Sequence, residues 1–203
     1  MRKFKAIIFD LGNVVFDVSF ERVFQSWALA SGHDARVLEQ KFLFDAFIDA
    51  FERGEISDAE FRVEISKRLH LNLRDDAFDA GWCDLYLAMR RGMDELLMEL
   101  KQRYRLVALT NTNRIHARVW TKKYSDSLKI FDRIFSSHEM NARKPEAKAY
   151  QDVIRYLELR PQEAIFLDDA AVNIEGAAVC GLSTIHVHSH AQMLVDLREM
   201  LND

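Results

Sequence analysis

Hydrophobic and polar residues follow different rhythms in different parts of the chain. Residues 4–10, FKAIIFD, form a short run that is apolar on both faces, which is typical of a strand inside a parallel sheet. From residue 18 to 90 the apolar residues have helical spacing, without a convincing strand. After Gly92, short apolar runs alternate with amphipathic stretches. This order predicts an α/β protein with a helical insertion after its first strand.

The helical block is expected to contain four helices. Asp34 is a start signal, Ser57 and Glu60 form a capping box, and Gly32 and Gly54 mark helix ends. Helices of this length in succession favour a small bundle. We therefore expect residues 17–89 to form a helical cap, and residues 1–16 and 90–203 to form the core domain. The expected helices cover residues 20–31, 35–51, 59–69 and 74–88.

The remaining chain is expected to complete a Rossmann-like, doubly wound parallel sheet. Short strands alternating with amphipathic helices are typical of a sheet that helices cover on both faces. The first strand, apolar on both faces, belongs in the middle of this sheet. The expected strands cover residues 105–110, 133–137, 164–169 and 183–188. The expected helices cover residues 93–103, 114–123, 145–158 and 173–179, with a final helix from about residue 191.

Composition narrows the class of protein. At 203 residues the chain is long enough for one core with a smaller insertion. The formal net charge is −4 and the longest basic run is Lys122-Lys123, so we expect no nucleic-acid partner. No segment approaches the roughly 20 apolar residues of a membrane span. Cys83 and Cys180 are isolated, which favours a reducing, cytoplasmic location. A monomer and a homodimer both remain open.

Polar residues gather where the predicted strands end. The carboxyl ends of parallel strands meet at one edge of a sheet, where ligands bind. Several carboxylates there would repel one another unless a cation lay between them, and Mg²⁺ prefers such oxygen ligands. A hydroxyl, a backbone N–H and a lysine would then neutralise a phosphate group while an aspartate attacks phosphorus. The residues concerned are Asp10, Thr110, Asn111, Lys144, Asp168 and Asp169.

Four segments in order resemble the motifs of the haloacid dehalogenase (HAD) superfamily: IIFDLGNVV, ALTNTN, ARKPEAKAY and IFLDDAAVNIEGA. The helical block corresponds to the small helical cap of that superfamily, so the resemblance covers the whole chain. FDLGNV, ERGEIS and NTNR also resemble a bacterial branch related to α-D-glucose-1-phosphate phosphatases. The resemblance implies a Mg²⁺-dependent phosphatase acting on a small phosphorylated metabolite. A sugar phosphate such as a hexose-1-phosphate is the expected substrate.

The resemblance also implies roles for individual residues. Asp10 would be the nucleophile that forms an aspartyl-phosphate. Thr110 and Asn111 would hold the phosphate, and Lys144 would pair with the phosphate and Asp10.

The resemblance further implies a Mg²⁺ site. Asp10, the backbone carbonyl of Gly12, and Asp169 with Asp168 beside it would bind the ion. Asn173 stands where many members have an aspartate, and we expect it to support the site rather than bind the metal.

Gly12 departs from the pattern of the superfamily. Most of its phosphatases carry a second aspartate at this position, which acts first as general acid and then as base. Such help is typically worth about 10²–10⁴-fold in rate. Two explanations stay open. Either the leaving group needs little protonation, as the hemiacetal oxygen of a sugar-1-phosphate would, or Asp17 or a water molecule takes the role.

Two other functions are compatible with these residues. In a 2-haloacid dehalogenase the same aspartate attacks carbon and no metal is needed. In a non-catalytic interaction protein, Gly12 would mark lost activity.

His186, His188 and His190 alternate along HVHSH, and a solvated strand end is the favoured interpretation. Two interpretations stay open for Trp82 and for the turn at residues 51–56. They either pack in the core of the cap or face the substrate.

Overall fold

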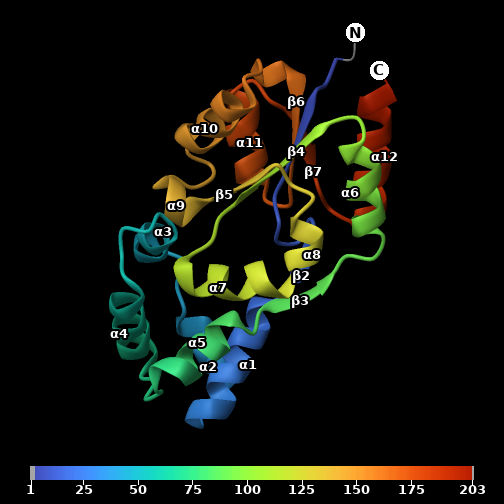
Figure 1. Cartoon of the computed structure of the whole chain (residues 1–203). Helices are drawn as coiled ribbons and strands as arrows, with labels where there is room; N and C mark the ends of the chain where they lie inside the picture. The colour runs from blue at the N-terminus through green and yellow to red at the C-terminus, as the bar shows by residue number, and fades with distance from the viewer. Residues whose placement is uncertain (1–2, 203) are drawn as a thin grey trace.

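A computed structural model describes residues 3–202, in which a five-stranded parallel sheet has the order β5-β4-β1-β6-β7. All four residues of β1 are buried, as the run that is apolar on both faces predicts for a central strand. Figure 1 shows helices on both sides of this sheet, so the predicted doubly wound α/β fold is confirmed. The strands are β1 (Ala6–Phe9), β4 (Arg105–Thr110), β5 (Arg133–Ser136), β6 (Ala164–Asp168) and β7 (Ser183–His186).

Each face of the sheet has its own hydrophobic core, because neighbouring residues of a strand point to opposite faces. Ile7 and Phe9 pack with α6, α7, α8 and α12, whereas Ala6 and Ile8 pack with α10 and α11. The short α9 and the 3₁₀ helix η1 connect elements on the rim. These helices are α6 (Met93–Lys101), α7 (Arg114–Lys123), α8 (Ser125–Leu128), α9 (Ser137–Met140), α10 (Ala147–Leu157), η1 (Pro161–Glu163), α11 (Ala171–Val179) and α12 (His190–Asn202). No helix among residues 3–202 combines the length and the apolar character that crossing a membrane requires.

The inserted segment differs from the sequence prediction first at its second helix. A single helix over residues 35–51 is wrong, because the chain is extended at Phe42, whose ring packs against Phe24 and Trp27. Asp45 then starts a new helix by accepting hydrogen bonds from two backbone N–H groups. The inserted helices are α1 (Phe20–Ser31), α2 (Ala35–Lys41), α3 (Ala46–Glu52), α4 (Asp58–Leu69) and α5 (Asp75–Cys83).

A second correction concerns the borders of the insertion. The expected helix over residues 74–88 stops at Cys83, and β3 (Tyr86–Met89) pairs antiparallel with β2 (Phe16–Val18). Tyr86 has no local signal for a strand; the pairing with β2 decides its conformation. The two strands bring both ends of the insertion together, next to the end of β1 (Figure 1).

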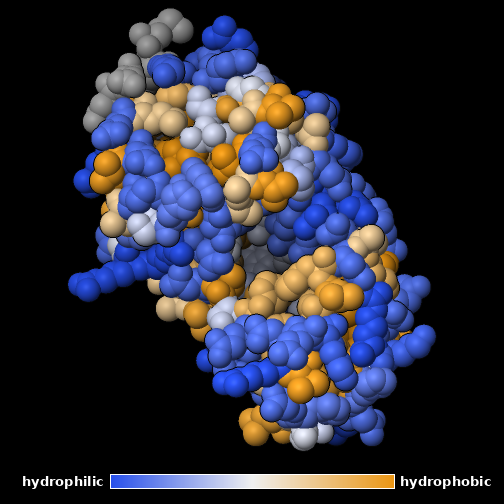
Figure 2. All heavy atoms as spheres, turned by 180° about the vertical axis from the view of Figure 1, so that it is seen from behind, coloured by the Kyte–Doolittle hydropathy of each residue, from blue (hydrophilic) through white to orange (hydrophobic). Residues whose placement is uncertain are grey.

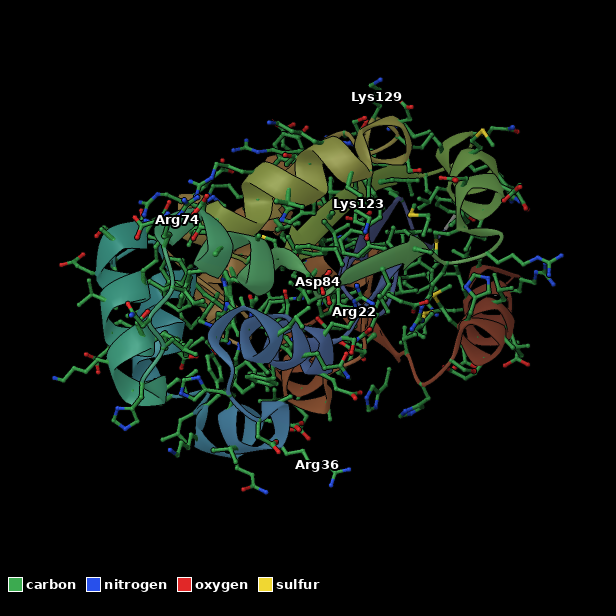
Figure 3. The ribbon with its side chains drawn as sticks, turned by 90° about the horizontal axis from the view of Figure 1, so that it is seen from below. Arg22, Arg36, Arg74, Asp84, Lys123 and Lys129 are labelled. Carbon is green, nitrogen blue, oxygen red and sulfur yellow. The ribbon has the colours of Figure 1, made fainter. Side chains whose placement is uncertain are left out.

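Aromatic packing joins the inserted helices to one another and to the sheet. Trp27 of α1 stacks on Trp82 of α5 and donates a hydrogen bond to the Phe78 carbonyl at 2.9 Å. Arg22 and Asp84 point toward each other across the same pair of helices (Figure 3), with Nη2 and Oδ1 2.9 Å apart. The buried cluster that contains these rings is continuous with one face of the sheet. The division into a cap at 17–89 and a core stays a prediction.

The turn after α3 is one place where the insertion meets the rest of the chain. Arg114 at the start of α7 donates to the carbonyls of Gly54 and Ile56, and Asn141 donates to the carbonyl of Arg53. Arg53 in turn pairs with Glu146, Nη1 to Oε1, at 3.0 Å. These contacts hold α3 over the edge of the sheet where its strands end.

We expect Gly54→Ala to destabilise the protein by at least about 3 kcal/mol. Gly54 has φ +75°, and an added Cβ would lie 2.4 Å from the carbonyl oxygen of His138. Gly32 is the matched control, because its φ is +74° and an added Cβ would have no neighbour within 4 Å. Gly32→Ala should therefore lose only about 1–2 kcal/mol of unfolding free energy, the cost of placing a residue with a Cβ in the left-handed conformation. Urea unfolding measures both losses. If Gly54→Ala and Gly32→Ala lost the same unfolding free energy, the close approach of His138 to Gly54 would not matter for stability.

Candidate functional site

The predicted polar residues meet at the carboxyl edge of the sheet. Asp10 directly follows β1, Thr110 ends β4, and Asp168 ends β6. Carboxyl oxygens of Asp10, Asp168 and Asp169 lie within 4.8 Å of one another. The sheet therefore brings together residues that are almost 160 positions apart in sequence.

Lys144 is the cation of this group. Its side chain is only 1% exposed, and Nζ lies 2.8 Å from Asp10 Oδ1 and 2.6 Å from Asp168 Oδ2. Burial opposes the charge, but the two carboxylates raise the pKa of Lys144 above its ordinary value. The lysine therefore stays protonated and holds the two aspartates in position.

Asp10 lies in a strongly acidic environment. Burial, together with the charges of Asp168 and Asp169, raises its pKa to about 7, although Lys144 acts in the opposite direction. Three carboxyl groups thus lie together, and Lys144 pairs with two of them, Asp10 and Asp168. A second positive charge at this point would lower the pKa of Asp10 and keep it ionised.

Asp168 already has several hydrogen-bond partners besides Lys144. Its Oδ1 accepts from the backbone N–H of Ala170 at 2.8 Å, and both of its oxygens accept from Asn173 Nδ2, at 3.0 and 3.1 Å. Asn173 thus supports a carboxylate, the role expected for it from the sequence. Asp169 is exposed and makes fewer such contacts, which leaves its oxygens freer for a metal ion.

Two residues that hold Asp169 were not identified from the sequence. Asn13 donates from Nδ2 to Asp169 Oδ2 at 3.1 Å, and its Oδ1 accepts from the N–H of Val18. His186, at the end of β7, lies with Nε2 2.9 Å from the carbonyl oxygen of Asp169. Asn13 has φ 55°, and an asparagine directly after Gly12 was the available signal for such a turn.

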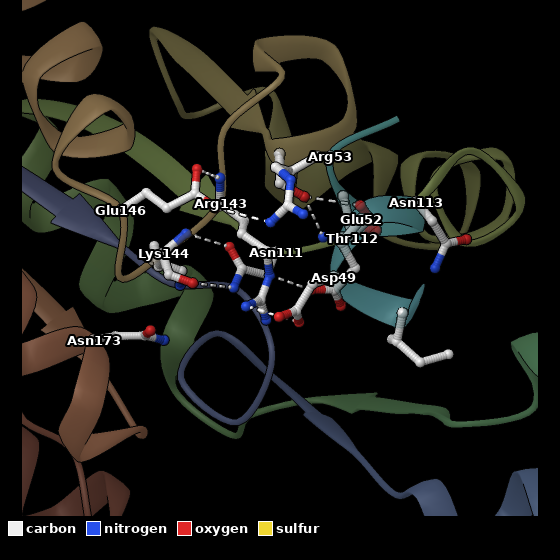
Figure 4. Close-up of polar contacts among 12 residues, drawn as sticks. Asp49, Glu52, Arg53, Asn111, Thr112, Asn113, Arg143, Lys144, Glu146 and Asn173 are labelled. Carbon is white, nitrogen blue, oxygen red and sulfur yellow. Dashed lines mark hydrogen bonds and ion pairs between the residues drawn. The ribbon is translucent and has the colours of Figure 1, made fainter. Parts of the chain in front are cut away.

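Asn111 supports the lysine segment with its side chain. Its Nδ2 donates to the carbonyl of Lys144, and its Oδ1 accepts from the backbone N–H of Lys144, both at 2.9 Å (Figure 4). Both side-chain atoms of this amide thus hold the backbone of Lys144, and the backbone N–H of Asn111 is a further donor for a ligand. Thr110 is buried beside it in the wall of the cavity described next.

A cavity of about 150 Å³ extends from Asp10 and Lys144 toward the inserted helices. Figure 2 shows the surface hollowed between the half that holds the sheet and these helices. Most of the wall is apolar or aromatic, and Glu52, Thr112 and His116 add polar groups. The apolar wall consists of Phe16, Val18, Phe20, Phe44, Ile48, Trp82, Leu85, Tyr86 and Trp120.

His116 is part of the wall rather than a reactive group. Its Nε2 lies 3.0 Å from the carbonyl of Trp82, which only accepts, so Nε2 carries the proton. Its Nδ1 is 3.1 Å from Asn113 Nδ2, and the ring stacks on Trp82. Burial lowers the pKa of His116 to about 3, so the ring is neutral at pH 7.

Asp17, one of the groups that could replace the missing general acid, lies away from the cavity, whereas Gly12 lies in its wall. Asp17 pairs with Arg90 at 2.7 Å between Oδ1 and Nε, and it is not among the residues that line the cavity. Gly12 does line the cavity, and an added Cβ would meet only Val18, at 3.6 Å, an ordinary contact. The lack of a side chain at Gly12 is therefore not imposed by local packing.

Comparisons with known proteins agree with this geometry. A family model described as a haloacid dehalogenase-like hydrolase matches residues 4–181. The chain is 22% identical over 203 residues to a D-ribitol-5-phosphate phosphatase from Bacteroides thetaiotaomicron, with 98% of each chain covered. It is 24% identical over 200 residues to the sesquiterpene phosphatase astK from Aspergillus oryzae, covering 98% of this chain and 97% of the other.

A solved structure extends the comparison to a bound state. It is a HAD family enzyme from Bacteroides thetaiotaomicron in complex with magnesium and inorganic phosphate. Sequence identity is 27% and the TM-score is 0.79, with 92% of this chain and 96% of that chain covered. The likeness spans nearly the whole of both chains, the inserted helices included.

Proposed function

Because the chain belongs to the haloacid dehalogenase-like hydrolase family, we propose that it is a Mg²⁺-dependent phosphatase that forms an aspartyl-phosphate on Asp10. One observation carries the proposal: Asp10, Lys144, Asp168 and Asp169 gather at the carboxyl edge of the sheet. A phosphatase needs a nucleophile, fixed positive charge for the phosphate and oxygen ligands for a cation, and this group offers all three. The phosphatases and the magnesium–phosphate complex among the similar proteins support it.

The donor set fits magnesium. Mg²⁺ prefers oxygen ligands and is usually held by one or two carboxylates together with phosphate and water. Asp10, Asp169 and the backbone carbonyl of Gly12 would hold it, with Asp168 beside them, and a cation there would oppose the burial and the neighbouring acids that raise the pKa of Asp10. When bound, the ion supplies charge that offsets the carboxylates and the phosphate oxygens.

The residues of the chain account for the remaining steps. Asp10 attacks phosphorus, while Lys144 keeps its carboxylate in place and offers an ammonium to the phosphate. The Thr110 hydroxyl and the backbone N–H of Asn111 bind the phosphate oxygens. We also propose that residues 17–89 act as a cap that selects the leaving group, and that the protein acts in the cytoplasm as a monomer or homodimer.

A sugar phosphate such as a hexose-1-phosphate is the proposed substrate. Hydroxyl groups of a sugar need acceptors and donors in the wall; the carboxyl of Glu52 is one such acceptor, whereas the Thr112 hydroxyl already accepts from Trp120 Nε1 at 3.1 Å. The indole N–H of Trp82, in the same wall, has no hydrogen-bond partner among the described residues. An unpaired buried donor costs about 1–3 kcal/mol, so a substrate oxygen that accepts from it would bind favourably.

A second substrate class is favoured by the aromatic wall. Phe20, Phe44 and Trp82 present flat apolar rings to the cavity, and these suit the hydrocarbon part of a prenyl phosphate as well as the apolar face of a sugar ring. The similarity to a sesquiterpene phosphatase points the same way.

We expect a panel of phosphorylated metabolites to identify turnover that depends on Mg²⁺. The panel contains hexose-1-phosphates, hexose-6-phosphates, pentitol phosphates and farnesyl phosphate, and released phosphate is measured. EDTA should reduce release to background, and added Mg²⁺ should restore it, because the carboxylates need the cation. No turnover on any substrate with Mg²⁺ present would refute the proposal. Chloride release from a 2-haloacid without metal would favour a dehalogenase instead.

A further inference from the structure

The phosphatase reaction needs a proton for the oxygen that leaves phosphorus, and Gly12 offers none. In the transition state the attacking and leaving oxygens lie roughly in line on opposite sides of phosphorus. With Asp10 attacking from the sheet, the leaving oxygen points away from the sheet and into the cavity under the inserted helices. A proton donor that serves it must therefore line this cavity.

The ionisable residues that line the cavity, within the described chain, leave one candidate. His116 is neutral and both of its ring nitrogens are engaged. Lys144 is held by Asp10 and Asp168, and burial raises the pKa of Tyr86 well above its ordinary value. Apart from Asp10, which is the attacking group, the remaining ionisable residue of the wall is Glu52.

Glu52 is held firmly at this position. It is the last residue of α3, its side chain is 20% exposed, and Oε2 accepts from Arg143 Nε at 2.9 Å. Arg143 also pairs with Asp49 on the same helix, Nη1 to Oδ1 at 2.9 Å (Figure 4). Arg143 thus anchors the carboxyl of Glu52, and Glu52 and Lys144 line the same cavity.

The surroundings of Glu52 suit a group that gains and loses a proton. Burial raises its pKa above the ordinary value, Arg143 and Lys144 lower it, and Asp49 raises it. The protonated form is therefore accessible nearer to neutral pH, and Arg143 stabilises the carboxylate that remains after transfer.

We infer that Glu52 is the general acid and base of this reaction and replaces the side chain that Gly12 lacks. The inference rests on the proposed phosphatase function. In the first step a carboxylate oxygen of Asp10 bonds to phosphorus and the bond from phosphorus to the leaving oxygen breaks. That oxygen keeps the electron pair and takes the proton of Glu52, so the alcohol leaves.

The second step returns the enzyme to its starting state. The Glu52 carboxylate removes a proton from water as the water oxygen bonds to the phosphorus of the aspartyl-phosphate. The bond between phosphorus and Asp10 breaks, its electron pair returns to the carboxylate, and inorganic phosphate is released. Glu52 is protonated again and Asp10 is ionised.

Glu52→Gln tests the inference with two leaving groups of different basicity. Gln keeps the shape and still accepts from Arg143, but it carries no transferable proton. For glycerol-2-phosphate, whose alkoxide needs a proton, kcat/KM should fall by about 10²-fold or more. For p-nitrophenyl phosphate, whose nitrophenolate leaves without a proton, kcat/KM should change by less than about threefold.

The second step supplies an independent measurement. Loss of the base slows hydrolysis of the aspartyl-phosphate, so Glu52→Gln should release a rapid burst of nitrophenolate equal to the enzyme concentration, followed by slow turnover. In addition, kcat/KM of the wild type for glycerol-2-phosphate should decline as pH rises through the pKa of Glu52. That decline should be absent in the variant.

Asp49→Asn is the matched control. It alters the other partner of Arg143 on the same helix, and Asp49 is not among the cavity-lining residues. It should change kcat/KM for both substrates slightly and by the same factor, and it should show no burst of nitrophenolate. Equal losses of kcat/KM on both substrates in Glu52→Gln would show that Glu52 only holds Arg143, which would overturn the inference. No phosphate release from any substrate by the wild type would instead refute the proposed phosphatase.

Discussion

Asp10→Asn is expected to abolish phosphate release, lowering kcat by about 10⁴-fold or more, as removal of a nucleophile does in other enzymes. The amide has nearly the same shape as the carboxylate but cannot form the acyl phosphate. Because burial and the neighbouring acids raise the pKa of Asp10 to about 7, its charge is not a source of stability at neutral pH. The variant should therefore remain folded, and phosphate release with Mg²⁺ is the measurement.

Asp17→Asn is the control for this result. It replaces the same residue type, Asp by Asn, seven positions after Asp10. Asp17, however, pairs with Arg90 and does not line the cavity. Its turnover should stay within about threefold of the wild type, because Asp17 does not line the cavity and a partly exposed ion pair contributes little. If Asp10→Asn kept most of its activity while Asp17→Asn lost it, the assignment of the nucleophile would be wrong.

Lys144→Met should cost about 3–5 kcal/mol of unfolding free energy at pH 7, in addition to the loss of activity. The side chain of Lys144 is 1% exposed, and its removal leaves two buried aspartates without their cation. An uncompensated buried charge is far more costly than the net worth of the ion pair. Urea unfolding in EDTA measures the effect without interference from bound metal.

The loss should depend on pH in a defined direction. The pKa of Asp10 is already raised to about 7, and without Lys144 it must rise further. A carboxyl with a raised pKa contributes stability that is present at low pH and is lost as pH rises through its folded pKa. Asp10 is mostly protonated in both proteins near pH 5, so the deficit of Lys144→Met relative to the wild type should change little up to about pH 6 and grow as pH rises through 7 toward 8.

Lys148→Met provides the comparison for Lys144→Met. Lys148 lies on α10, is 56% exposed, and pairs with Asp152 at 2.9 Å on the surface. Its loss should change the unfolding free energy by less than about 1 kcal/mol at either pH. If the two lysine variants unfolded at the same urea concentration at pH 7, Lys144 would not be the cation that compensates the two buried aspartates.

The family prediction from four short motifs is confirmed, and the reason is local. Each motif couples an apolar strand to the polar residue that follows it, and such couplings are visible in a window of about ten residues. Asp10 after an all-buried run is the clearest case. The doubly wound sheet followed from the same alternation of strands and helices, because right-handed crossovers leave few other arrangements.

The errors arose where distant residues determine the local structure. Tyr86 is in a strand only because Phe16–Val18 pairs with it, and Phe42 interrupts a helix because its ring fills a space between Phe24 and Trp27. Tyr86 has no signal in its neighbours, and the local signal near Phe42 is Asp45, a preferred residue for the start of a helix. Helix propensity is a weak preference that such tertiary contacts override.

The sequence by itself determined the α/β class, the central place of the first strand and the identity of the acids and the lysine at the strand ends. Only the tertiary structure decided which of them have free oxygens: Asp168 is occupied by Lys144 and Asn173, whereas Asp169 is exposed. It also decided that Glu52, in a helix of the insertion, lines the cavity above Asp10. Local patterns record what each segment buries, but distances between segments arise only when the sheet and the inserted helices pack against each other.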